Sequence, residues 1–215
     1  MVSAWSWVPR KHYSILTTGA LVNAFKKGRD SVPNDPQSPI LMALYMRKPD
    51  EAERLATGAR LNIWEAAALG RDERVAELVQ EDLSLPNAWS PDGFTPIGLA
   101  AFFGHPSTAR ILVDAGADVG AVARNEMKVQ PLHAAAAAKE IEIVRMLLEQ
   151  GADPNARQQA GYTALMECAR GGRDDMVALL LAHGADPTLR TDDGKSASDL
   201  ARENGQTAIA ERLLR

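Results

Sequence analysis

The chain has 215 residues, of which 46% are hydrophobic, 5% aromatic and 24% charged, and its formal net charge is −4. This apolar content can build a sizeable core, and the scarcity of aromatic side chains predicts that Ala, Leu, Val and Ile fill it. Because a surface that binds nucleic acid is usually basic, we expect no nucleic-acid partner.

Cysteine content and hydropathy bear on where the protein resides. The single cysteine, Cys168, excludes an internal disulfide and favours a reducing compartment, so we expect a cytoplasmic protein. No apolar run reaches the ~18 residues that a membrane-spanning helix needs, so we expect no membrane association.

Residues 1–37 are expected to form an N-terminal extension, either a short helix or a partly disordered segment. They carry five basic and two acidic residues (net +3), whereas residues 38–215 carry 19 basic and 26 acidic residues (net −7). The mildly apolar stretch 15–25 follows Arg10 and Lys11, as in an export signal, but polar residues interrupt it. An extension is therefore the preferred interpretation, with export as the alternative.

A short motif recurs through the rest of the chain. Gly116-Ala117-Asp118 returns 35 residues later from Gly151, and a further 33 residues later from Gly184. A fixed period of this length indicates stacked supersecondary units. Apolar residues spaced i, i+3, i+4 before each glycine predict an amphipathic helix. The predicted units are approximately 38–62, 63–90, 91–123, 124–157, 158–190 and 191–215.

Capping residues and glycines predict the helix ends. Thr95 can cap a first helix through its hydroxyl, and Pro96 suits the first turn, where no N–H is needed. Gly151 follows a second helix, where a left-handed backbone favours glycine. We expect a larger residue to be tolerated better at Gly172, because its neighbour Gly171 can supply the flexibility.

The central units resemble the ankyrin repeat. The block from Asp92 to His105, with Thr95-Pro96-Ile97 and Leu99-Ala100-Ala101, and its continuation from Ile111 to Val119 carry the resemblance. Units 130–157 and 161–190 match about equally well, and the flanking units match more weakly. The resemblance implies an all-α ankyrin-repeat solenoid of about six helix-turn-helix units, whose degenerate terminal caps face water on their outer sides.

Three departures from the repeat pattern stand out. Asn62 runs directly into Ile63, so the turn between the first two units is nearly absent. The connection between the third and fourth units contains two extra residues within 122–129. Lys139 stands where a glycine usually follows the first helix.

Histidine and cysteine raise the possibility of catalysis. The resemblance implies that His105 and His133 brace the backbone between units, and Cys168 occupies a small-residue position held by alanine in sister units. No histidine pair has zinc-ligand spacing, so we expect neither a metal nor a cofactor. We predict that the protein is not an enzyme; the alternative is a small hydrolase or transferase that uses His133 or Cys168.

Positions that vary between units are candidates for binding a partner, and the resemblance implies that they line a concave groove and its turn tips. Clustered exposed aromatic side chains often mark interaction sites. The alternative for either Phe102 or Phe103 is packing in the core. The predicted partner-binding residues are Trp89, Phe94, Phe102, Phe103, Met127, Val129, Tyr162, Arg170 and Lys195.

The resulting functional hypothesis is a monomeric, non-enzymatic module for protein–protein interaction. The alternative within the same class is a regulatory inhibitor whose groove blocks one specific enzyme. The two differ only in the partner, which the sequence does not identify.

Overall fold

The computed structural model describes residues 38–214, so the predicted extension 1–37 lies outside the described residues. Residues 38–214 form six consecutive pairs of α-helices and no β-strand, which confirms the predicted all-α repeat architecture. The pairs are α2 (Pro39–Tyr45) and α3 (Pro49–Ala56), α4 (Ile63–Ala68) and α5 (Asp72–Glu81), α6 (Pro96–Phe103) and α7 (Pro106–Asp114), α8 (Pro131–Ala138) and α9 (Ile141–Glu149), α10 (Ala164–Arg170) and α11 (Asp174–Ala182), and α12 (Ala197–Glu203) and α13 (Thr207–Arg212).

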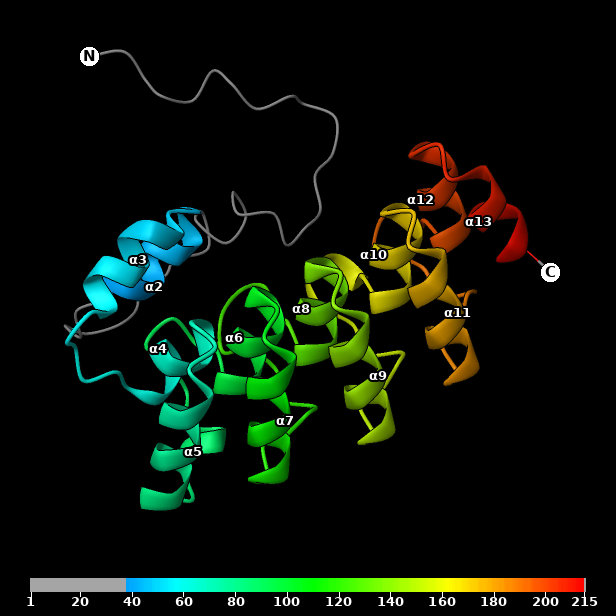
Figure 1. Cartoon of the computed structure of the whole chain (residues 1–215). Coiled ribbons are helices and arrows are strands. Elements are labelled where there is room, and N and C mark those ends of the chain that lie inside the picture. Colours follow the sequence, from blue (N-terminus) through cyan, green and yellow to red (C-terminus); the bar gives the residue numbers. More distant parts are fainter. Residues whose placement is uncertain (1–37, 215) are drawn as a thin grey trace, which may run out of the picture.

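From α4 onward the helices stack in two rows. The first helices α4, α6, α8, α10 and α12 form an inner row, and α5, α7, α9 and α11 form an outer row (Figure 1). Alanine dominates the inner row, where Ala100, Ala135 and Ala169 are all fully buried. Such small side chains let neighbouring helices approach closely, as the composition predicted.

The helix ends follow the predicted capping pattern. The Thr95 hydroxyl accepts a hydrogen bond from the Gly98 N–H (3.3 Å) at the start of α6. Gly151 has a φ of +86° after α9, as expected for a left-handed cap. Lys139 also has a positive φ, +68°, and so takes the conformation of the glycine that it replaces.

The expectation for Gly172 was wrong. The left-handed residue is Gly172 itself, with a φ of +74°, whereas Gly171 is an ordinary helical residue with a φ of −79°. A Cβ at Gly172 would also lie 2.8 Å from the Gln206 Oε1 atom, whereas a Cβ at Gly151 would meet no atom within 4 Å. A side chain at Gly172 is therefore strained on both counts, because Gly171 does not take over the turn.

The turns that precede the inner helices form a hydrogen-bonded series. From α6 onward each is closed by a backbone bond of the same kind, such as Gln158 N–H to Tyr162 O (2.9 Å), or Ala123 N–H to Val129 O (2.8 Å) in the lengthened turn. Neighbouring turns are also joined; the Gln159 N–H, for example, donates to the Met127 carbonyl (3.0 Å). The two extra residues therefore enlarge one turn without interrupting the series.

The first helix pair departs from the two rows. α2 and α3 pack mainly against each other and lie to one side of α4 (Figure 1). The segment that joins them to α4 contains the exposed residues 57–60, and it forms no turn of the kind seen in later units. The nearly absent turn that the sequence indicated therefore coincides with a change in how the helices stack.

Candidate protein-binding surface

The inner row and its turns share one surface, which we call the inner face. A small cavity in it is lined by residues from the turns (Phe94, Val129), from α6 (Leu99, Phe102) and from α8 (Ala134). Side chains distant in sequence therefore meet where the repeat pattern varies most between units. This arrangement makes the inner face the candidate site.

The three phenylalanines of the third unit lie together on the inner face. Phe102 and Phe103 meet edge to face, with ring centroids 5.0 Å apart, a favourable aromatic geometry. Phe94, Phe102 and Phe103 are all half-buried and pack against the core. Phe102 and Phe103 therefore each combine the core and surface roles that the sequence presented as alternatives, and Phe94 does so as well.

Tyr45 of α2 joins this cluster, and the sequence analysis missed it. Its ring lies 5.6 Å from that of Phe103, and its hydroxyl donates a hydrogen bond to the Asp92 carboxylate (2.7 Å). Burial and the neighbouring Asp92 raise the pKa of Tyr45 well above its usual value, so the hydroxyl stays protonated. Because the contact joins residues 47 or more positions apart, no local motif signals it.

Met127 and Val129 are corrections to the predicted site. Their side chains are only 2% and 5% exposed and belong to the core. Between them Lys128 is exposed and has a φ of +50°. The lengthened turn therefore directs both flanking side chains inward and the lysine outward, so Met127 and Val129 offer no surface to a partner.

The lengthened turn instead places a cation beside Trp89. The Arg124 guanidinium carbon lies 4.3 Å from the ring centroid, within the range of a cation–π contact. Trp89 is half-buried and Arg124 is exposed. The pair adds a mixed aromatic and basic feature at the edge of the inner face.

The remaining predicted site residues lie on the fifth and sixth units. Arg170 forms an ion pair with Glu167 (3.2 Å), and both side chains are largely buried. The more exposed Lys195 pairs with Glu203 (2.8 Å). Tyr162 is half-buried at the base of its turn, and burial raises the pKa of its hydroxyl.

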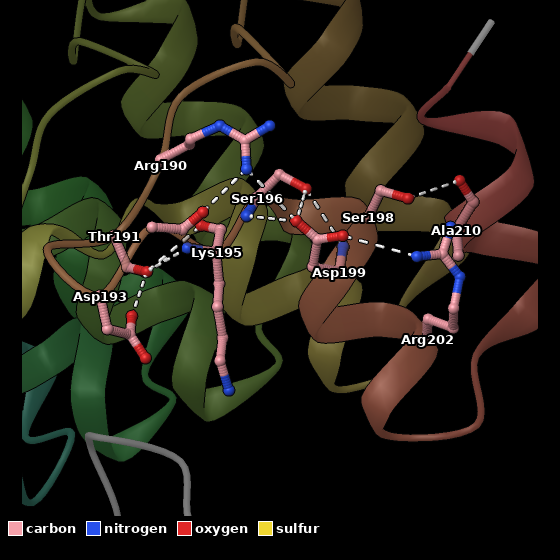
Figure 2. A network of polar contacts seen from close by, with 10 residues as sticks. Arg190, Thr191, Asp193, Lys195, Ser196, Ser198, Asp199, Arg202 and Ala210 are labelled. Carbon is pink, nitrogen blue, oxygen red and sulfur yellow. Dashed lines mark hydrogen bonds and ion pairs between the residues drawn. The ribbon is translucent and has the colours of Figure 1, made fainter.

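Hydrogen bonds hold the last turn in position against the final helix pair. The Thr191 hydroxyl accepts from the Lys195 N–H (3.0 Å), and Ser196 and Asp199 form a capping box at the start of α12. The Ser198 hydroxyl donates to the Ala210 carbonyl (3.0 Å) and so joins α12 to α13 (Figure 2). Lys195 therefore extends from an ordered backbone.

His133 and Cys168 lie inside the array. The His133 Nε2–H donates to the Ala156 carbonyl (3.0 Å), and burial lowers the pKa of the imidazole to about 4. Burial raises the pKa of the Cys168 thiol to about 12, and its side chain is 1% exposed. A protonated, buried thiol is a poor nucleophile. His133 ties α8 to the turn that follows α9 in its own unit, whereas His105 braces the third unit against the second through the Ala68 carbonyl (3.0 Å).

The described residues give no support for a metal site or a membrane-spanning helix. Residues 38–214 contain no cluster of three or more His, Cys, Asp or Glu side chains arranged to hold a metal ion. Among the same residues, no helix has the length and apolar character needed to cross a bilayer.

Fold and surface together define a solenoid of stacked helix pairs, the class of protein in which an extended face rather than a closed pocket contacts ligands. Family comparisons agree with this assignment. The family model described as "Ankyrin repeats (3 copies)" matches residues 63–158, and "Ankyrin repeats (many copies)" matches residues 147–201. The chain belongs to the ankyrin repeat family, whose members generally mediate protein–protein interactions and are generally non-enzymatic.

Individual relatives share the repeats within longer proteins. "Ankyrin repeat and SAM domain-containing protein 6" of Mus musculus is 37% identical over 123 residues, covering 54% of this chain and 13% of that protein. "Tyrosine-protein kinase Shark" of Drosophila melanogaster is 30% identical over 195 residues, covering 90% of this chain and 20% of the kinase. The chain thus spans a fifth or less of the length of these relatives.

Proposed function

We propose that this chain is a non-enzymatic recognition module that binds a protein partner through its inner face. The supporting observation is the cluster of half-buried aromatic side chains of the third unit, continued by Tyr162 on the fifth. Large aromatic groups that retain some exposure lose solvent on binding and often dominate the affinity of an interface. We further propose that it acts as a monomer in the cytoplasm, consistent with its single, unpaired cysteine.

Charged residues would assist binding in a different way. Lys195 and Arg124 lie at the turns, where they can orient an approaching partner and raise its association rate. Arg170, unlike Lys195, is largely buried in its ion pair, so we assign it a role in shaping the surface. Of the nine residues predicted to bind a partner, the two buried ones, Met127 and Val129, are excluded. The other seven remain in the proposal, with Arg170 in this supporting role.

Paired variants test the proposal. Partners are first recovered from the native cell with the immobilised chain and identified by mass spectrometry, and their affinities are then measured. We expect the double substitution Phe94→Ala and Tyr162→Ala to weaken binding by about 30-fold, as loss of ~2 kcal/mol at an interface centre implies. The matched control is Arg145→Glu on the exposed side of α9, which should leave affinity unchanged.

Stability is measured beside affinity, because Phe94 also packs against the core. Weaker binding by a variant whose unfolding midpoint is retained supports the inner face. Normal binding by the double variant together with loss in Arg145→Glu would move the interface to the outer row and contradict the proposal.

A further inference from the structure

The first helix pair occupies part of the inner face. In a solenoid each unit contacts only its nearest neighbours, yet Tyr45 in the first unit reaches past α4 to Phe103 in the third. Tyr45 also lines the cavity that includes Ala134 of the fourth unit. The C-terminal end of α2 therefore lies on the inner face, where a partner would bind, and the helix does not extend the inner row.

α2 is held there from both of its ends. At its start, the Ser38 hydroxyl donates to the Glu65 carboxylate of α4 (2.6 Å). At its end, Tyr45 is 2% exposed and bonds to Asp92. Ile40 and Leu41 are buried between these points, and every residue of this two-turn helix is apolar apart from the hydroxyl of its terminal tyrosine.

The segment between α3 and α4 allows α2 to leave its position on the inner face. Residues 57–60 are exposed, and Gly58 has a φ of +73° with no atom within 4 Å of an added Cβ. The second unit also lacks the turn that, in later units, is hydrogen-bonded to its neighbour. α2 and α3 can therefore move as a pair without breaking the backbone bonds of the turn series.

We propose that α2 is an exchangeable occupant of the inner face, and that the partner replaces it with a short apolar helix ending in a tyrosine. The inference rests on the proposed function and specifies the chemistry of the ligand. The partner's tyrosine would donate to Asp92 and stack beside Phe103, as Tyr45 does. In the free protein α2 would shield these groups and lower the apparent affinity of the site.

The cavity beside Tyr45 indicates how a partner competes successfully. Gln130 lines it, and its buried Oε1 atom accepts no hydrogen bond. Leaving a buried acceptor unsatisfied is unfavourable. A partner helix that adds a donor near its tyrosine gains a bond that α2 does not make.

A peptide titration on the full chain tests the proposal. The probe is a fluorescein-labelled synthetic peptide with the sequence of residues 38–47, and binding is followed by anisotropy. In the wild-type chain, the attached helix α2 competes with the peptide at an effective concentration on the order of millimolar. A substitution that weakens the contacts of α2 should therefore make the inner face beside Asp92 and Phe103 accessible to the peptide. We expect the peptide to bind Tyr45→Ala at least tenfold more tightly than wild type, and binding to fall when Asp92→Ala is added.

Met46→Ala is the matched control, because Met46 neighbours Tyr45 and is exposed; this variant should bind the peptide like wild type. Equal binding of the peptide to wild type and a folded Tyr45→Ala chain, or binding to neither, would overturn the proposal and make α2 a fixed cap. This result would leave the proposed function standing, because the partner assay does not use the peptide.

Hydrogen exchange on the unaltered chain provides a second test if Tyr45→Ala fails to fold. We expect amides of α2 and α3 to exchange through an opening that leaves α6 and α8 protected. Exchange of all four helices in one common step would overturn the proposal.

Discussion

His133 illustrates how a single buried side chain ties an inner helix to the turn that leads into the next unit. Its Nε2–H donates to the Ala156 carbonyl, so the Nδ1 atom that accepts from the Gln130 N–H must be unprotonated. Burial, opposed only in part by groups such as the Ala156 carbonyl, lowers the pKa of the imidazole to about 4. The native fold therefore requires the neutral form.

This requirement predicts a pH dependence of stability. Between the unfolded pKa of about 6.5 and the native pKa of about 4, the unfolded chain binds a proton at His133 that the native chain does not. The free energy of unfolding is therefore retained above pH 6.5, and it declines by up to about 3 kcal/mol as the pH falls toward 4. Urea unfolding of wild type and His133→Gln across pH 4–7 isolates this contribution, and parallel profiles would contradict it.

The turns between units depend on a repeated asparagine. Asn87 donates to the Gly116 carbonyl (2.9 Å) and accepts from the Asp118 N–H (2.7 Å). Asn155 makes the same two bonds to the next unit, to Gly184 and Asp186 (3.0 and 2.7 Å). Between them, the equivalent position is occupied by a glycine, Gly120. One junction of the array therefore lacks a bridge that the junctions on either side possess.

Supplying that bridge should stabilise the protein. In Gly120→Asn the new side chain can reach the Gly151 carbonyl and the Asp153 N–H, and an added Cβ would make an ordinary 3.4 Å contact with Asp118. We expect a gain of about 1 kcal/mol in the free energy of unfolding, from the hydrogen bonds and from reduced unfolded-state entropy. Gly120→Ala supplies only the entropic part, so equal stabilities in urea unfolding would exclude the bridge.

At the scale of the whole molecule, the regular part of the fold was predictable and the irregular part was not. The recurring Gly-Ala-Asp motif and the capping signals predicted the two rows, because every unit repeats the same local interactions. The position of α2 depends on contacts such as Tyr45 to Asp92 that join non-adjacent units. The nearly absent turn at residue 62 marked a departure from the repeat pattern but did not show what covers the inner face.

The candidate site was predictable to a similar extent. Phe94, Phe102 and Phe103 were identified by comparing units, because the repeat pattern leaves their positions free to vary. Met127 and Val129 were misassigned because both side chains of the lengthened turn are buried in the core, with Lys128, at a positive φ, exposed between them. Backbone conformation in an inserted segment cannot be inferred from the neighbouring units, which lack the insertion.

The measurement that tests the central claim most directly is hydrogen–deuterium exchange of the full chain with and without its recovered partner. The account predicts that binding protects the turn and inner helix of the third unit, residues 90–103, and those of the fifth, residues 158–170. The outer helices α7, α9 and α11 should exchange at unchanged rates. Protection confined to those outer helices, with the inner face unaffected, would contradict the account.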